Sequence, residues 1–119
     1  MSADGQGRER TAGGPATGTA ALSPDALMAE AREASDFLKA LGHDGRLLML
    51  YHLSERDLTV TELEQLIMSR QAAVSQQLAR LRHEKLVNTR RDGNQIIYSL
   101  ADPRVRELVQ VIQRLFRGG

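Results

Sequence analysis

The sequence predicts a mainly α-helical fold with one β-hairpin near its C-terminal end. Apolar residues recur at helical spacing in several segments, which predicts amphipathic helices. Two β-rich runs flank "DGN" at residues 92–94, which is a strong hairpin signal. The expected order is four helices, a hairpin and a last helix, with a possible short strand in "SERDL" before the third helix.

The chain has 119 residues, so one domain is expected. Its first twenty or so residues are rich in Gly, Ala and Thr and carry no large apolar residue after Met1. Such a segment cannot bury enough surface to offset ordering entropy, so residues 1–22 are interpreted as a disordered tail and residues 23–117 as the domain. No signal peptide and no membrane-length apolar run is present. The sequence therefore predicts a cytoplasmic protein with no membrane partner.

The first helix is predicted by the residues at its two ends, and the second by its composition. Ser23 is a typical N-cap, Pro24 suits the first helical position and Gly42 is a typical stop. The stretch "HDGRLLMLYHL", residues 43–53, is apolar almost all round. That composition predicts a short, buried central helix.

The third helix is predicted in "TVTELEQLI", residues 59–67. Thr59 or Thr61 could cap it, with Glu62 or Glu64 completing a capping box. A brief break at "MSR" separates it from the fourth helix.

The fourth helix is predicted from about Gln71 to His83, with Val74, Leu78 and Leu81 facing inward. At 100° per residue the opposite face is small and polar. It holds Ala72, Gln76, Ala79 and His83, flanked by Ser75 and Arg80.

The hairpin strands are predicted in "KLVNTRR" and "QIIYSL". The last helix is capped by Asp102, with Pro103 in its first turn. Its apolar stripe consists of Val105, Leu108, Val109, Ile112 and Phe116.

Charge is unevenly distributed on a chain whose formal net charge is +1. One stretch holds Arg70, Arg80, Arg82, Lys85, Arg90 and Arg91 against Glu84, whereas most acidic residues lie earlier, between Asp25 and Glu64. A locally basic surface on a near-neutral chain favours a polyanionic partner. The alternative is an ordinary solvated helix with scattered charges.

Two short helices joined by a tight break, the second with a polar outer face, predict a helix-turn-helix. Gln can pair with adenine in the major groove, Ser adapts to either base type, and Ala can approach a thymine methyl. Arginines at the helix edge and on the hairpin suit phosphates or the minor groove. The sequence therefore predicts a reader of double-stranded DNA.

Two other classes remain as alternatives. A winged-helix module that docks a protein would not need the polar face with flanking arginines, and steep salt dependence of duplex binding would separate the two. An enzyme is not expected, because the sequence shows no paired carboxylates on one face, no nucleophile beside a base and no phosphate loop.

The segments "ALGHDGRLLMLYHL", "LTVTELEQLI", "AAVSQQLARLRHEKLV" and "TRRDGNQIIYSL" resemble successive parts of the ArsR/SmtB family of winged-helix repressors. The resemblance runs from about Phe37 to Phe116. It implies a homodimer whose first and last helices pack across the two-fold axis. Each recognition helix would then enter one major groove of an imperfect palindrome, about one helical turn from its mate.

The resemblance also implies residue roles. Gln71, Ala72, Ser75 and Gln76 correspond to base contacts, Thr61 and Arg80 to phosphate contacts, and Arg90, Arg91 and Asn94 to the wing. Many members have Ser or Thr at the position of Arg70, so either Ser69 caps the helix early or Arg70 contacts a phosphate. The expected dimer interface comprises Leu27, Leu38, Leu108, Val109, Ile112 and Phe116.

Family members usually release DNA after binding a metal or oxidising a thiol pair. The third-helix metal site has cysteines where this chain has Thr59 and Thr61, and hydroxyls are poor ligands for soft ions. The last-helix site would need His where Arg104 follows Asp102, and no later His exists. Neither metal site is therefore expected.

The thiol-switch members look most similar overall, but Tyr51 and Arg117 stand at their two cysteine positions and the chain has no cysteine. Disulfide or polysulfide sensing is thereby excluded, and the inducer is left unassigned. The three scattered histidines are a poor metal set, so no cofactor is expected. His43 is expected to cap or pack, and His83 to lie near DNA. Tyr51 and His52 are interpreted as a packed aromatic beside an exposed His, with a small-molecule pocket or haem ligation as the alternative.

Overall fold

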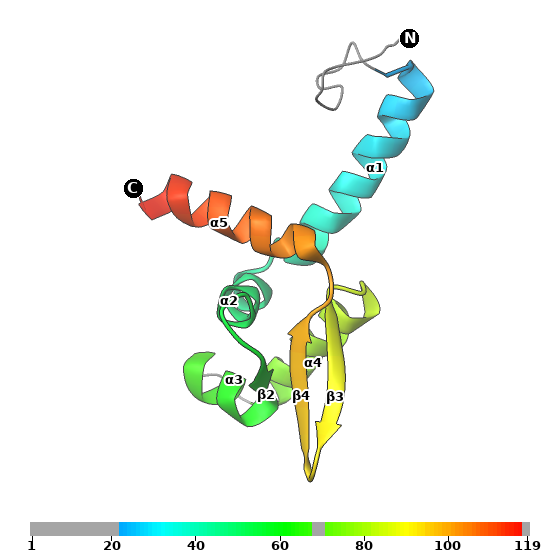
Figure 1. Cartoon of the computed structure of the whole chain (residues 1–119). Coiled ribbons are helices and arrows are strands. Elements are labelled where there is room, and N and C mark those ends of the chain that lie inside the picture. Colours follow the sequence, from blue (N-terminus) through cyan, green and yellow to red (C-terminus); the bar gives the residue numbers. More distant parts are fainter. Residues whose placement is uncertain (1–21, 68–70, 118–119) are drawn as a thin grey trace. The chain divides into compact units, whose positions relative to one another are not determined.

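The computed structural model describes residues 22–67 and 71–117. The part up to Asp36 and the part from Phe37 onward are separate compact units, and each is described by itself. The predicted order of elements is confirmed, including the short additional strand (Figure 1). The elements are α1 (Pro24–Leu41), α2 (Asp44–Leu53), β2 (Leu58–Thr59), α3 (Val60–Ile67), α4 (Gln71–His83), β3 (Val87–Asp92), β4 (Gln95–Leu100) and α5 (Pro103–Arg117). Except for Leu22, the expected tail lies outside the described residues.

The predicted boundaries of the first two helices are confirmed by their hydrogen bonds. The Ser23 hydroxyl accepts a hydrogen bond from the Ala26 amide at 3.2 Å, and α1 ends one residue before Gly42. His43 is the N-cap of α2, where its Nδ1 accepts from the Gly45 amide at 3.1 Å. Side-chain acceptors at these positions satisfy amide groups that have no partner within the helix.

The start of α3 is a reciprocal capping box between Thr59 and Glu62. The Thr59 hydroxyl accepts from the Glu62 amide at 3.1 Å, and the Glu62 carboxylate accepts from the Thr59 amide at 2.9 Å. Thr59 is therefore the cap, and Thr61 is exposed in the first turn. The hydrogen bond from the Thr59 amide is the main reason that the pKa of Glu62 lies below its ordinary value; Arg56, 3.3 Å from the carboxylate, adds to the effect.

The three strands form an antiparallel sheet in the order β2-β4-β3. Its register pairs Leu58 with Tyr98 and Val87 with Leu100. Asp92 pairs with Gln95, so Gly93 and Asn94 form a two-residue turn. Gly93 has a φ of +65°, a conformation that costs glycine little, at the first central position where tight hairpin turns favour it.

The core of the unit from Phe37 onward surrounds α2. Met49, Leu50 and Leu53 on this helix are buried, as expected for a central helix. The inward positions predicted on α4 are confirmed, since all three are at most 1% exposed. Removing these side chains from water drives the packing of the helices on one face of the sheet. The other buried core residues include Leu58, Leu63, Leu86, Val87 and Val105.

The apolar stripe of α5 divides between core and surface. Val109 is only 1% exposed and packs in the core of its own protomer, so its expected place at a dimer interface stays a prediction. Leu108 packs partly against this core. Leu115 and Phe116, by contrast, are 67% and 83% exposed.

Arg104 joins the beginning of α5 to the end of α1. Its amide and guanidinium both donate to the Asp102 carboxylate, the guanidinium at 2.7 Å, and these contacts with Arg104 hold the pKa of Asp102 below its ordinary value. The same guanidinium lies 4.7 Å from the centre of the Phe37 ring, a cation–π geometry. Along the described chain, no helix has the length and apolar character needed to cross a membrane.

Candidate nucleic-acid interface

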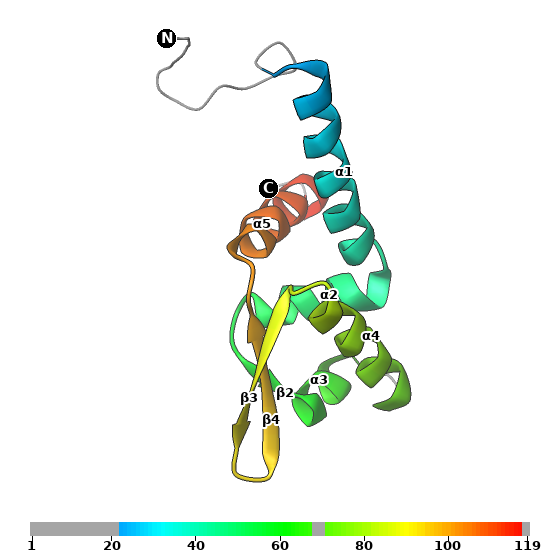
Figure 2. The same ribbon diagram turned by 90° about the vertical axis from the view of Figure 1, so that its right-hand side faces the viewer.

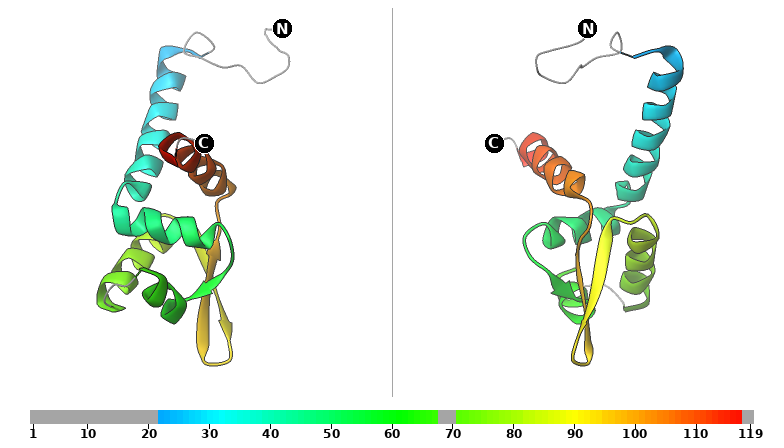
Figure 3. Two further views of the ribbon diagram at one scale, coloured as in Figure 1. Left: turned by 90° about the vertical axis from the view of Figure 1, so that its left-hand side faces the viewer. Right: turned by 45° about the vertical axis from the view of Figure 1, so that its right-hand side comes forward.

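The helix-turn-helix and the hairpin tip lie at one end of the unit that begins at Phe37. Figures 2 and 3 show α3 beside the N-terminal end of α4, at the same end as the β3–β4 turn. The C-terminal end of α4 instead adjoins the start of β3. One surface can therefore present the first turns of α4 and the wing tip together, as groove recognition requires.

The outward face of α4 is exposed along the helix. Ser75, Gln76, Ala79, Arg80 and His83 are all exposed, because the residues between them pack into the core. Gln71 and Ala72 lie in the first turn, but their side chains are outside the described residues, and so is all of Arg70. The structure thus brings together most of the polar side chains on which the sequence prediction rested.

The cationic side chains on this surface differ in whether they already form an ion pair within the protein. Arg80 forms an i,i+4 ion pair with Glu84, with 3.3 Å between nitrogen and oxygen. Both groups are partly exposed, and such surface pairs are weak, so a phosphate can compete for this guanidinium.

The two wing arginines lie on opposite faces of the sheet. Arg90 pairs across the sheet with Ile97 and donates to the Asp57 carboxylate at 2.8 Å. Arg91 pairs with Ile96, on the face that carries Thr89 and the buried Val87. Among the described residues Arg91 has no ion-pair partner. Sequence reasoning treated these neighbours alike, because nothing local reveals that Asp57 reaches Arg90.

Gln77 is a second residue whose role the sequence did not reveal. Its side-chain oxygen accepts a hydrogen bond from Arg46 Nη1 at 2.9 Å. Arg46 also donates to the carbonyl oxygens of Ala40 and Lys39, at 2.6 and 3.2 Å. The recognition helix is therefore connected through one guanidinium to the last turn of α1. An arginine within an otherwise apolar helix was the only available signal.

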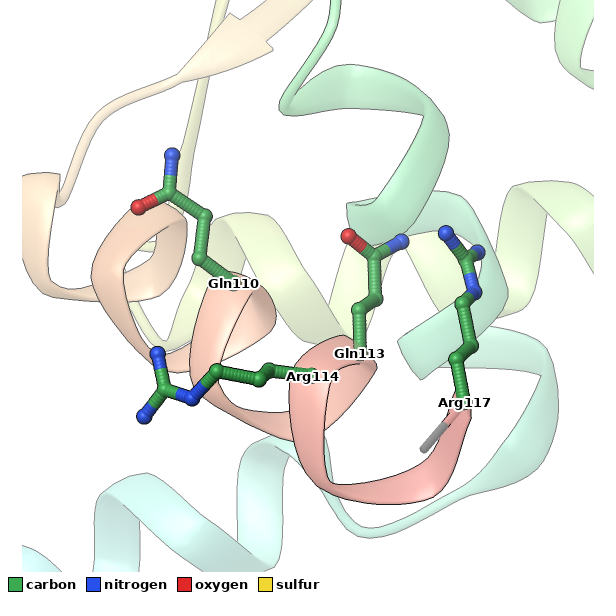
Figure 4. Close-up of a pocket in the computed structure, with 4 residues that line it drawn as sticks. All are labelled: Gln110, Gln113, Arg114 and Arg117. Atoms are coloured by element: carbon green, nitrogen blue, oxygen red, sulfur yellow. The ribbon is translucent and has the colours of Figure 1, made fainter. Parts of the chain in front are cut away.

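Tyr51 and Arg117, which stand where the thiol-switch members have cysteine, lie in different helices. Tyr51 is half-buried against the core, and its carbonyl oxygen accepts from the Ser54 hydroxyl at 2.6 Å. Arg117 lies in the last turn of α5 and lines an open hollow of about 340 Å³ with Gln110, Gln113 and Arg114 (Figure 4). Gln113 and Arg117, one turn apart, project the same way, whereas Arg114 extends to the other side.

The histidines are separated in the structure. His43 caps α2 as expected, and His83 is exposed at the end of α4. His52 is half-buried rather than exposed, because the last turn of α2 is packed on several sides. Within residues 22–67 and 71–117 no group of three or more His, Asp or Glu side chains could hold a metal ion.

A helix-turn-helix with an exposed polar second helix, beside a basic β-hairpin, defines a winged helix-turn-helix protein of the DNA-binding class. The chain belongs to the ArsR family: residues 43–89 match the family described as "Bacterial regulatory protein, arsR family". It is a DNA-binding transcriptional regulator.

Named relatives agree with this assignment. The "Biofilm growth-associated repressor" of Agrobacterium fabrum is 36% identical over 91 residues, covering 76% of this chain and 78% of that protein. The "Transcriptional activator HlyU" of Vibrio cholerae is 37% identical over 79 residues, covering 66% of this chain and 73% of that protein. The solved structure of the transcriptional repressor BigR from Xylella fastidiosa has a TM-score of 0.74 and 36% identity, covering 80% of this chain and 97% of that one.

Proposed function

We propose that this protein is a cytoplasmic, homodimeric repressor that binds an imperfect DNA palindrome. The observation that carries the proposal is the exposed Ser75–Gln76 face of α4, which lies at the same end of the unit as a wing whose Arg91 forms no ion pair with another described residue. Neither a solvated helix nor a core element requires that combination.

The first half of α4 supplies base contacts in this proposal. Gln71, Ala72, Ser75 and Gln76 would enter the major groove, where Gln can form two hydrogen bonds with one adenine. Val74 and Leu78, buried on the opposite face, fix the rotation of the helix about its axis. The reading face is therefore held by packing rather than by the DNA.

Phosphate and wing contacts surround this face. Thr61, Arg70 and Arg80 would bind backbone phosphates, and Asn94 at the hairpin turn would lie beside the adjacent groove. Arg91 would be the principal wing cation, because no other described residue forms an ion pair with it. Arg90 would contribute less while Asp57 holds it.

The proposed dimer uses apolar side chains that the protomer leaves exposed. Leu38 is 54% exposed, and Leu115 and Phe116 are more exposed still. A second copy would cover these residues together with the half-buried Leu108 and Ile112. Leu27, in the separately described part of α1, is proposed as a dimer contact of that unit by itself.

The experiment is a binding selection with genomic fragments and the purified full-length protein at two salt concentrations. Recovered fragments should share an imperfect palindrome with half-sites about 10 base pairs apart, and affinity should fall as salt rises. Deleting the gene should then raise transcription next to the bound sites. Sequence-blind binding that salt abolishes would contradict specific recognition, and lower transcription after deletion would contradict repression.

A further inference from the structure

A basic hollow lies beside the C-terminal end of α4, away from the first turns of the helix that carry the proposed base contacts. It measures about 540 Å³ and is lined by Arg82, Lys85, Val87, Asn88, Thr89 and Ala101. Neither Arg82 nor Lys85 forms an ion pair with any other described residue. The neighbouring carboxylate of Glu84 is engaged with Arg80 instead. Two cations that form no ion pair within the described part of the chain therefore share one concave surface.

Lys85 occupies a backbone conformation that lysine rarely adopts. The Leu86 amide donates to the Leu81 carbonyl at 2.9 Å and the Lys85 amide to the Arg82 carbonyl at 3.0 Å, the hydrogen bonds of a Schellman motif. Lys85 is the left-handed residue of this motif, with a φ of +62°, where glycine is usual. Lysine here opposes folding relative to glycine.

The positive charge of Lys85 is not needed to stabilise the C-terminal end of α4. Arg80, Arg82 and His83 already place basic groups in the last turn of α4, where such groups interact favourably with the negative end of the helix dipole. A strained residue that folding does not need indicates a role for its side chain. That side chain lines the hollow.

The lining groups define the chemistry of a ligand. Arg82 and Lys85 carry permanent positive charge, the Asn88 amide and the Thr89 hydroxyl add neutral donors, and no carboxylate is among the described lining residues. We propose that this hollow binds a small oxyanion: a phosphate or carboxylate group carried by a small molecule.

The hollow lies far from the proposed base contacts at the start of α4 and from the wing turn, and nearer to Arg80, a proposed phosphate contact. Asn88 lies about 17 Å from the wing turn, at about 3.3 Å per strand residue. Lys85 lies about 20 Å from Gln71, at 1.5 Å per helical residue. An anion bound here would connect the end of the recognition helix to the first residues of the wing strand, so it could alter the relative position of the two. This last step rests on the proposed function; the binding site does not.

Anion binding can be measured on the full-length protein without DNA. Inorganic phosphate and succinate are titrated separately at constant ionic strength against a chloride reference, and backbone amide shifts are followed by NMR. Shifts should be concentrated at residues 85–89 for at least one of the two, and the more effective anion identifies the ligand group. Equal shifts in chloride, or none localised to these residues, would overturn the proposal.

Lys85→Gly separates stability from binding. It should raise the Tm by a few degrees, because glycine suits the left-handed position, and weaken anion binding at least tenfold. Arg82→Gln should also weaken binding, whereas Arg114→Gln on α5 is the matched control and should not. Unchanged anion affinity in Lys85→Gly would reject the site. Weaker operator binding in this variant with anion affinity intact would assign the hollow to the DNA backbone and also reject it.

Discussion

Arg46 Nη1 lies 2.9 Å from Gln77 Oε1 and thereby connects the second helix to the recognition helix. The remaining nitrogens of the same guanidinium donate to the carbonyl oxygens of Ala40 and Lys39. Arg46 therefore supplies hydrogen-bond donors to two carbonyl groups at the end of α1 and holds the side chain of Gln77 at the same time. A change at the end of α1 can reach α4 through this one side chain.

We expect Arg46→Lys to lose most of this connection, because an ammonium group cannot reach three separated acceptors in a fixed fork. Unfolding free energy should fall by about 1–3 kcal/mol, and specific DNA affinity should fall further than this stability loss explains. Urea unfolding and operator titration measure the two effects. Arg114→Lys is the control on an exposed helix face. If Arg46→Lys matches the wild type in both assays, Arg46 does not position α4.

Replacing Gln76 with Ala should weaken binding to the preferred operator by about 1–3 kcal/mol and relax the preference at one base pair. The variant should fold normally because Gln76 is exposed. Competition titrations with single-base operator variants would reveal the relaxed position, with Gln110→Ala on α5 as the control. Undiminished discrimination would mean that the recognition helix is placed in the wrong register.

The opposite environments of Arg90 and Arg91 predict different effects on DNA binding. Arg91→Ala should weaken binding to all sequences alike and reduce the salt slope by about one unit. Arg90→Ala should have a smaller effect. Asp57→Asn should increase affinity, because it releases the Arg90 guanidinium from a neutralising contact of 2.8 Å. Affinity measured over a salt series tests all three, and a loss of affinity in Asp57→Asn would refute the assignment.

A charge on the exposed end of α5 should prevent dimer formation without unfolding the protomer. Phe116→Glu is the first choice because this side chain is 83% exposed, and Ile112→Glu tests the half-buried neighbour. Light scattering should report a monomer, circular dichroism an intact fold, and operator binding should be lost. Gln110→Glu controls for charge. Val109→Glu should instead unfold the chain, since its side chain lies in the core. A fully dimeric Phe116→Glu protein would exclude the proposed interface.

Acid should destabilise the protein through Asp102 and Glu62. Both carboxyl groups have a pKa below the ordinary value, Asp102 mainly through Arg104 and Glu62 mainly through the Thr59 amide. A lowered folded-state pKa stabilises the fold above the unfolded-state pKa of about 4, and this contribution is lost as pH falls through the folded value. Urea unfolding between about pH 6 and pH 2.5 should show the decline. Asp102→Asn should make the unfolding free energy depend less on pH. An unchanged pH dependence in this variant would contradict the assignment of the acid effect to Asp102.

Local signals were sufficient for most of the fold. The cap at Ser23, the inward spacing of Val74 and Leu78, and the hairpin around Gly93 each depend on residues close together in the sequence. Helix and strand periods repeat every 3.6 and 2 residues, so a short window carries the information. The limits of α4 were predicted in this way, although the choice between Thr59 and Thr61 as the cap of α3 needed the hydrogen bonds.

The sequence by itself determined the order of elements, the polar face of α4, the basic hairpin and the lack of cysteine at residues 51 and 117. Only the tertiary structure decided which side chains remain available for a partner. Arg90 is held by Asp57, 33 residues away, and Gln77 by Arg46, 31 residues away. Packing likewise assigned Val109 to the core and left Phe116 exposed. Such pairings arise when separate elements pack together, and no periodicity within a single element encodes them.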